Sequence, residues 1–293
     1  MNFLIILVLC LLAATKVLTQ SRFAKKNTKG IADSAMFNST VFATMGLFAL
    51  TMARFDDLNP SLIIGAACFG FFSISFQMMY QVALSCGPTS ITALIASLAS
   101  IIPLVISAVL YKEPLNAVNL VGVVLIVITL IMNADVKKDL GADKKKNVGK
   151  KWFLFIMLAF FSNSFGMISQ QMYAKMSGEV SSFTFVSCAS FVASILGFSV
   201  FGILRLKGHR LSYKLSAATV LPCIAVGVVL GTFQVLHTYA LAVIPGTVLF
   251  PTYSAGATIS IALGSTVVFR EKLSRAQCVS LVIGIVAIVL INI

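Results

Sequence analysis

Apolar runs of membrane-spanning length follow one another along this sequence. A helix needs roughly 20 mostly apolar residues to cross about 30 Å of hydrocarbon, and charged residues, proline and glycine divide the chain into ten such runs. The expected spans are residues 2–20, 33–53, 61–83, 89–111, 117–134, 152–173, 182–204, 217–240, 246–269 and 275–293. With 59% hydrophobic and 11% charged residues, the chain has too little polar surface for a water-soluble globule. We therefore expect an all-α, multi-pass integral membrane protein.

The basic residues mark one face of that membrane protein. Of the 22 Lys and Arg, 18 lie in odd-numbered connections between spans, three lie in even-numbered ones, and Lys16 lies within the first span. Basic loops stay on the cytoplasmic side, so both termini are expected outside. The first run lacks a positive n-region and is expected to remain as a span. Because the charges flank spans in short loops, the expected partner is membrane lipid and not nucleic acid.

One block of sequence occurs twice. Residues 110–115 precede the apolar run that finishes at Asn133, and residues 268–273 precede the run that finishes at Asn292, each with a basic residue beside a glutamate. We expect a first five-helix repeat at 1–134, a basic linker at 135–151 and a second five-helix repeat at 152–293. An odd number of spans per repeat inserts the second repeat upside down, and such inverted repeats enclose a site near the bilayer midplane.

Polar residues within the spans agree between the two repeats. When the two repeats are aligned, Gln20 corresponds to Gln170 at a constant offset. In the third span of each repeat, Gln77 corresponds to Gln234 and Tyr80 to His237. A glutamine or histidine facing lipid leaves donors and acceptors unpaired, so these side chains are expected to point inward. They either line a cavity or only hydrogen-bond across helices. The candidate substrate-binding residues are Gln20, Gln77, Tyr80, Gln81, Gln170, Gln234, His237, Thr252 and Tyr253.

The fourth and ninth spans are rich in small, hydroxylated and proline residues. Proline removes an intrahelical hydrogen bond and lets a helix flex, so these spans are expected to line the site and to move. An alternative for the ninth span is close packing through Gly256, Ser260 and Gly264. The candidate hinge residues, including two glutamates expected to act as clasps at opposite mouths, are Pro88, Pro103, Pro245, Pro251, Glu113 and Glu271.

Two titratable residues within spans have alternative roles. Lys16 either attracts an anionic substrate or snorkels toward the cytoplasmic end, and we favour snorkelling. His237 either couples protons or stays neutral and hydrogen-bonded, and we favour the neutral form. No Asp or Glu lies deep in a span, which argues against a multidrug antiporter that exchanges protons for cations.

No catalytic or cofactor-binding pattern stands out. The sequence has no phosphate loop, nucleophile-base pair or metal-spaced Cys/His cluster, and its six cysteines fall within or beside spans. We expect no enzyme, no cofactor and no metal.

Paired five-helix halves that each close on such a hinge resemble the EamA-like drug/metabolite transporter superfamily over nearly the whole chain. Residues 14–20 followed by Arg22 weakly resemble its nucleotide-sugar-transporter branch. The resemblance implies ten helices around a central cavity and a secondary transporter, working by alternating access, of a small polar metabolite such as an amino acid or sugar derivative. The alternatives are a lipid-linked substrate flippase and a non-transporting scaffold. We further expect the plasma (inner) membrane of a prokaryote and a possible homodimer. Family members usually have both termini in the cytoplasm, opposite to the orientation that the charges favour.

Overall fold

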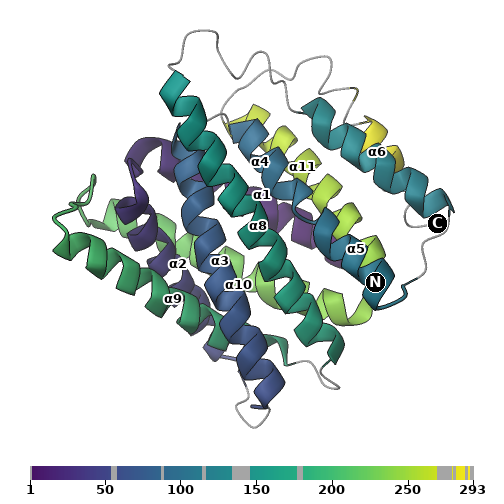
Figure 1. The fold of residues 1–293 in the computed structure, drawn as a ribbon, viewed down its shortest axis with the longest axis horizontal. Helices are drawn as coiled ribbons and strands as arrows, with labels where there is room; N and C mark the ends of the chain where they lie inside the picture. Colours follow the sequence, from purple (N-terminus) through teal and green to yellow (C-terminus); the bar gives the residue numbers. More distant parts are fainter. Residues whose placement is uncertain are drawn as a thin grey trace.

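A computed structural model describes residues 2–53, 58–86, 89–113, 117–133, 146–176 and 181–268, together with 279, 282–287 and 290. These residues form a bundle of α-helices, and none of them lies in a β-strand (Figure 1). The helices are α1 (Asn2–Asn27), α2 (Ile31–Leu50), α3 (Pro60–Cys86), α4 (Thr89–Leu98), α5 (Ile101–Leu110), α6 (Ala117–Asn133), α8 (Lys146–Met176), α9 (Ser182–Leu206), α10 (Ala217–Val243) and α11 (Gly246–Val268).

The helices follow the expected spans closely. Five of the described helices, α1, α3, α8, α9 and α10, contain segments long and apolar enough to cross a membrane. Two boundaries differ from expectation. Helix α1 continues to Asn27, beyond the expected end at residue 20. Helix α8 begins at Lys146, so residues 146–151 of the expected linker are its first turns, which suits a segment rich in the helix former lysine. Pro88 and Glu271 lie outside the described residues.

The expected fourth span is two helices. The Ser100 amide bonds to Ser97 O at 3.2 Å, which is a tighter turn than an α-helix makes. Pro103 lies in the first turn of α5 and cannot donate to the carbonyl of Ala99. Helix α8 compensates, because Ser164 Oγ donates to Ala99 O and Asn163 Nδ2 donates to Ala96 O, both at 3.0 Å. The second half of the chain therefore stabilises the break between α4 and α5, because side chains of α8 bind the carbonyls there.

Helices from the two halves of the sequence pack extensively against one another. The largest contacts join α3 to α8, α2 to α9, and α3 to α9, followed by α1 with α11 and α2 with α10. One buried apolar cluster, centred on Phe42, Phe69 and Phe185, fills the space between α2, α3, α9 and α10. A second, around Leu9, Leu241 and Phe250, joins α1, α10 and α11.

Two glycines illustrate the close approach of neighbouring helices. A Cβ on Gly227 of α10 would lie 2.6 Å from Thr44 Cβ and 2.8 Å from Val41 O of α2. A Cβ on Gly256 of α11 would lie 2.5 Å from Cys10 Sγ of α1. Small residues let backbones approach closely in lipid, so one face of α11 serves helix packing, as the sequence alternative stated.

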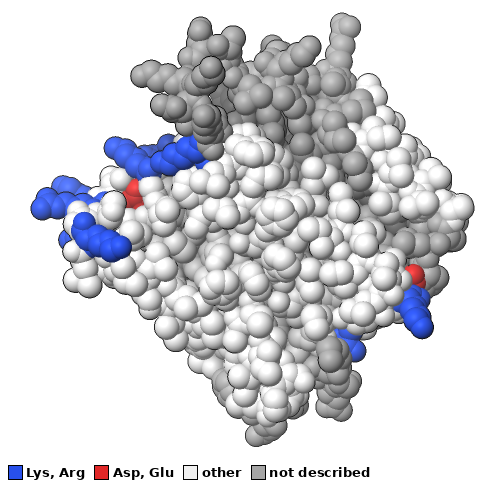
Figure 2. Space-filling model, viewed as in Figure 1, with Lys and Arg blue, Asp and Glu red and all other residues white. Residues whose placement is uncertain are grey.

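The outer surface is apolar between two polar ends. Large side chains such as Leu4, Phe71 and Ile195 are more than half exposed, which suits contact with lipid. Figure 2 shows the described basic residues gathered at one end of the view and fewer at the other, with an uncharged surface between them. Such a charge-free band is typical of a membrane-embedded surface.

Candidate functional site

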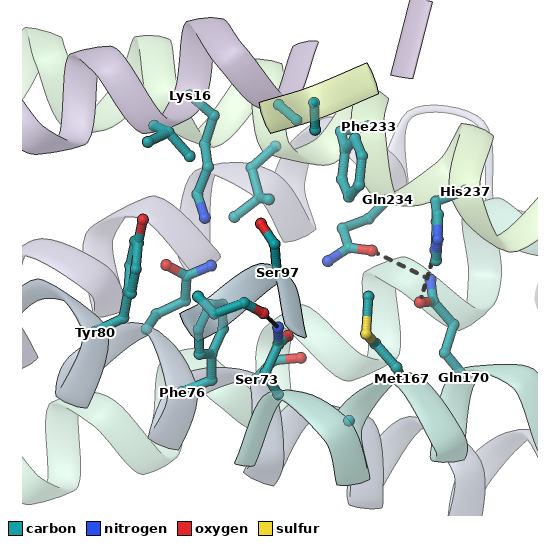
Figure 3. Close-up of a pocket in the computed structure, with 18 of the residues that line it drawn as sticks. Lys16, Ser73, Phe76, Tyr80, Ser97, Met167, Gln170, Phe233, Gln234 and His237 are labelled. Carbon is teal, nitrogen blue, oxygen red and sulfur yellow. Dashed lines mark hydrogen bonds between the residues drawn. The ribbon is translucent and has the colours of Figure 1, made fainter. Parts of the chain in front are cut away.

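A central cavity of about 120 Å³ lies between the helices (Figure 3). Its walls come from α1, α3 and α4 in the first half of the chain and from α8, α10 and α11 in the second, with Phe42 of α2. Among the described residues that line it, the polar side chains are Lys16, Ser73, Gln77, Tyr80, Ser97, Ser162, Asn163, Gln170, Gln234, His237, Tyr253 and Ser254. Six of the nine predicted substrate-binding residues are in this lining: Gln77, Tyr80, Gln170, Gln234, His237 and Tyr253.

The part of the cavity wall that comes from the first half of the chain, called the first-half wall, combines a hydrogen-bonded glutamine pair with a lysine. Gln20 Nε2 of α1 donates to Gln77 Oε1 of α3 at 3.1 Å. One turn earlier in α1, the Lys16 ammonium lies 5.7 Å from the centroid of the Phe76 ring and 5.9 Å from that of Tyr80. Both distances are within cation-π range. Figure 3 shows Lys16 reaching into the cavity, so the structure places its charge where a substrate could meet it.

The second-half wall is a neutral hydrogen-bond network with Gln170 of α8 at its centre. Gln170 Nε2 donates to Gln234 Oε1 at 3.2 Å and to Thr238 Oγ1 at 2.8 Å. Thr238 Oγ1 in turn donates to the Gln234 carbonyl at 2.8 Å. Gln170 Oε1 lies 3.0 Å from His237 Nδ1. Because an amide oxygen only accepts, this arrangement places the proton on Nδ1 in the neutral histidine.

The remaining ring nitrogen of His237 is an unused acceptor. Nε2 is buried and has no hydrogen-bond partner among the described residues. Phe233 stacks on the imidazole with ring centroids 5.4 Å apart, and the Tyr253 ring lies 5.6 Å away. The rings hold the histidine in place, and its free acceptor is available to a ligand that carries an O–H or N–H donor.

Three predicted binding residues do not line the cavity. Gln20 is buried behind Gln77. Gln81 is turned toward α2 and the end of α1, where its Oε1 accepts from Asn38 and its Nε2 donates to Thr28 Oγ1 at 2.9 Å. Thr252 is buried in α11 outside the lining. Residues at i and i+4 share a helix face, but the neighbouring helix decides which of them meets the cavity.

The two proline-rich spans meet at the cavity. Ser254 of α11 lies 2.6 Å, hydroxyl to hydroxyl, from Ser100 at the break between α4 and α5. Pro251 is inside α11 one turn earlier, and the helix continues through it. Pro245 stands just before α11, and its carbonyl accepts from the amides of Val248 and Leu249. Flexing at Pro251 would therefore move a cavity-lining hydroxyl.

Glu113 joins the two halves at one end of the bundle. Its Oε1 lies 2.9 Å from Lys175 Nζ, and its Oε2 accepts from the Thr247 amide at 2.9 Å. Lys112 has a φ of 52°, and this left-handed turn brings the Glu113 amide back to Ser107 O at 3.3 Å. Glu113 is thus in a position to act as a clasp, with Lys175 as its basic partner.

Asp33 makes the matching junction at the other end. Its Oδ1 accepts from the Ser212 amide at 2.7 Å and its Oδ2 from the Lys29 amide at 2.9 Å. Ser212 precedes α10 and Thr247 follows it. The 27 residues of α10 separate the two junctions by about 40 Å. Burial, and then the nearby Cys223 and Asp33, raise the pKa of Tyr213 above its usual range, so this residue adds no charge to the junction.

Three contributors were not selected from the sequence. Asp33 is an acidic residue at the start of an expected span, next to a connection of basic charge, which was the available signal for its role. Asn163 and Phe233 carried no distinguishing signal, because a lone amide or phenylalanine in a span is common in helix packing. Lys16 was noticed, but the favoured snorkelling differs from its position at the cavity.

Comparisons with known proteins agree with this architecture. Residues 2–134 match the EamA-like transporter family, so the resemblance read from the sequence is confirmed over the first half of the chain. One solved crystal structure, described only as a protein, has a TM-score of 0.70 and 14% identity, and the match covers 97% of this chain and 98% of that chain. At that identity the likeness shows the fold alone. A search of curated proteins finds no match. The family match over residues 2–134 and the apolar helices support a multi-pass membrane protein that is similar to transporters of the drug/metabolite type.

Proposed function

We propose that the protein is a secondary transporter that moves a small polar metabolite by alternating access. The observation that carries this proposal is the central cavity, which both halves of the chain enclose and line with amides and hydroxyls. Polar groups at membrane depth are costly unless they line a wet path or pair with one another. A cavity of about 120 Å³ suits a small solute, since an apolar cavity of about 150 Å³ holds benzene.

The hydrogen bonds support two inverted five-helix repeats. In the first half, Gln20 on α1 donates to Gln77 on α3 at 3.1 Å. In the second half, Gln170 on α8 donates to Gln234 on α10 at 3.2 Å. The same amide pair thus joins equivalent helices in each half. With ten spans, such repeats can rock around a site between them.

Two carboxylate junctions support the alternating part of the mechanism. Asp33 and Glu113 each bind backbone amides of the second half, at opposite ends of α10. In the structure both junctions are closed. A cycle that opens one junction while the other stays closed would expose the cavity to one side at a time.

A solute panel tests this function. We expect small polar metabolites to raise the melting temperature of the purified protein and to undergo counterflow in proteoliposomes.

Gln77→Leu and Gln234→Leu should each weaken binding about tenfold, because each removes a cavity amide, while folding is nearly unchanged. Thr232→Val is the matched control, since its hydroxyl is exposed on α10 and bonds to Val228 O. If both glutamine variants unfold and neither alters affinity, the glutamines serve helix packing only. The absence of counterflow for every stabilising solute would overturn the transport proposal.

A further inference from the structure

Lys16 is a basic side chain in the described lining of the cavity, and no ion pair with a carboxylate is found for it among the described residues. Among the described residues that line the cavity it is the only charged one. Lys175, by contrast, has its ammonium 2.9 Å from Glu113. The described residues place no carboxylate within ion-pair distance of Lys16. A charge held at membrane depth normally pairs with another charge or with polar groups.

The contacts of Lys16 stabilise the cation without neutralising it. Phe76 and Tyr80 present their rings to the ammonium at 5.7 and 5.9 Å, and ring faces attract a cation through their quadrupole. A ring carries no net charge, so the positive potential remains in the cavity. Walls of low dielectric strengthen that potential, because they screen it less than water does.

The opposite wall lacks an acidic residue and offers a neutral acceptor. His237 Nδ1 is engaged by Gln170 Oε1, which leaves Nε2 as a buried acceptor without a partner in the described chain. A cationic solute would meet Lys16 and find no carboxylate in the described lining. An anion with a hydroxyl or N–H donor would satisfy both walls at once.

We propose that the cavity binds a small organic oxyanion, with its negative group at the Lys16 ammonium and a hydrogen-bond donor of the same molecule at His237 Nε2. This inference rests on the proposed transport function of the cavity and names its substrate class. Carboxylates and phosphate esters share the oxyanion chemistry that an ammonium recognises. The experiment distinguishes the two sources.

Size-matched probes isolate the charge. Glycolate, glycolamide, ethanolamine and 2-hydroxyethyl phosphate share a hydroxyl donor for His237 Nε2 and differ in the group presented to Lys16. We expect the purified full-length protein to bind glycolate or 2-hydroxyethyl phosphate at least about tenfold more tightly than glycolamide, and not to bind ethanolamine. The tighter of the two anions identifies a carboxylate or a phosphate as the preferred group.

Variants of Lys16 test whether its charge causes the preference for an anionic probe over a neutral one. Lys16→Gln should abolish the difference between glycolate and glycolamide, and Lys16→Arg should restore it. Lys26→Gln is the matched control, because it removes the same charge from an exposed position of α1 and should leave the preference intact. Removing an unpaired charge from the membrane interior should not unfold the protein.

The outcomes separate this inference from the function on which it rests. If glycolamide binds as tightly as glycolate, or if Lys16→Gln retains the anion preference, the inference is overturned while the cavity remains a solute site. If none of the probes binds but neutral polar metabolites undergo counterflow, the inference fails and transport stands. If nothing binds and nothing undergoes counterflow, both proposals fail together.

Discussion

The two walls of the cavity share a framework and differ in chemistry. In each half, a glutamine of one helix donates to a glutamine of another, through Gln20 and Gln77 on one side and Gln170 and Gln234 on the other. The first wall adds the Lys16 cation. The second adds His237 and an aromatic cluster. The two walls thus share their amide pairs, whereas the polarity of the site comes from the residues in which the walls differ.

The first test compares the two donor glutamines and has the largest expected effect. Gln170→Leu removes bonds to Gln234, Thr238 and His237, so at an average of about 0.6 kcal/mol per interhelical bond it should cost about 2 kcal/mol. Gln20→Leu removes a single such bond and should cost about 0.6 kcal/mol. Equilibrium unfolding in mixed micelles measures both. Equal losses would mean that the two amide pairs contribute alike and that the network around Gln170 adds no stability.

The sequence predicted the helices that form the cavity better than it predicted the differences between the two cavity walls. Apolar run length predicted the helix positions, and a constant offset matched Gln20 with Gln170 and Gln77 with Gln234, but the hydrogen bonds within each half did not follow from it. Gln81 shows the limit of that reasoning, because it shares a helix face with Gln77 but is drawn away by Asn38 and Thr28. The partners of Asp33 and the position of Lys16 depend on packing between helices far apart in the chain, which periodicity does not specify.

The second test compares the two carboxylate junctions. Asp33→Asn and Glu113→Gln each remove the negative charge of the junction at one end of α10. Each should shift the conformational equilibrium by about 1.4 kcal/mol, which is tenfold, toward the state open at its own end. A cysteine introduced at Ser97, in a background without native cysteines, reports access to the cavity. Impermeant thiol reagents applied to oriented vesicles should label the two variants faster from opposite sides.

Labelling of both variants from the same side would contradict the assignment of the two junctions to opposite mouths. The same vesicles test the orientation inferred from the basic loops. A cysteine at Asn147 should be protected in intact cells if both termini are outside. Labelling of that site would reverse the orientation and leave the comparison of the junctions intact.

The last test compares the prolines of the fourth and ninth spans and has the smallest expected effect. Pro103 lies in the first turn of α5, after a break that Ser164 and Asn163 hold by binding freed carbonyls. Pro103→Ala should therefore change neither binding nor transport, because the break does not depend on a flexible residue.

Pro251 is inside α11, one turn before Ser254 at the cavity, and its missing amide lets the helix flex at that point. Pro251→Ala should slow saturated counterflow about threefold, equivalent to about 0.7 kcal/mol in the barrier, with little change in affinity. Equal rates for this variant and the parent would make Pro251 a packing residue, and the movement of the ninth span would then have to occur at its start, where Pro245 precedes the helix.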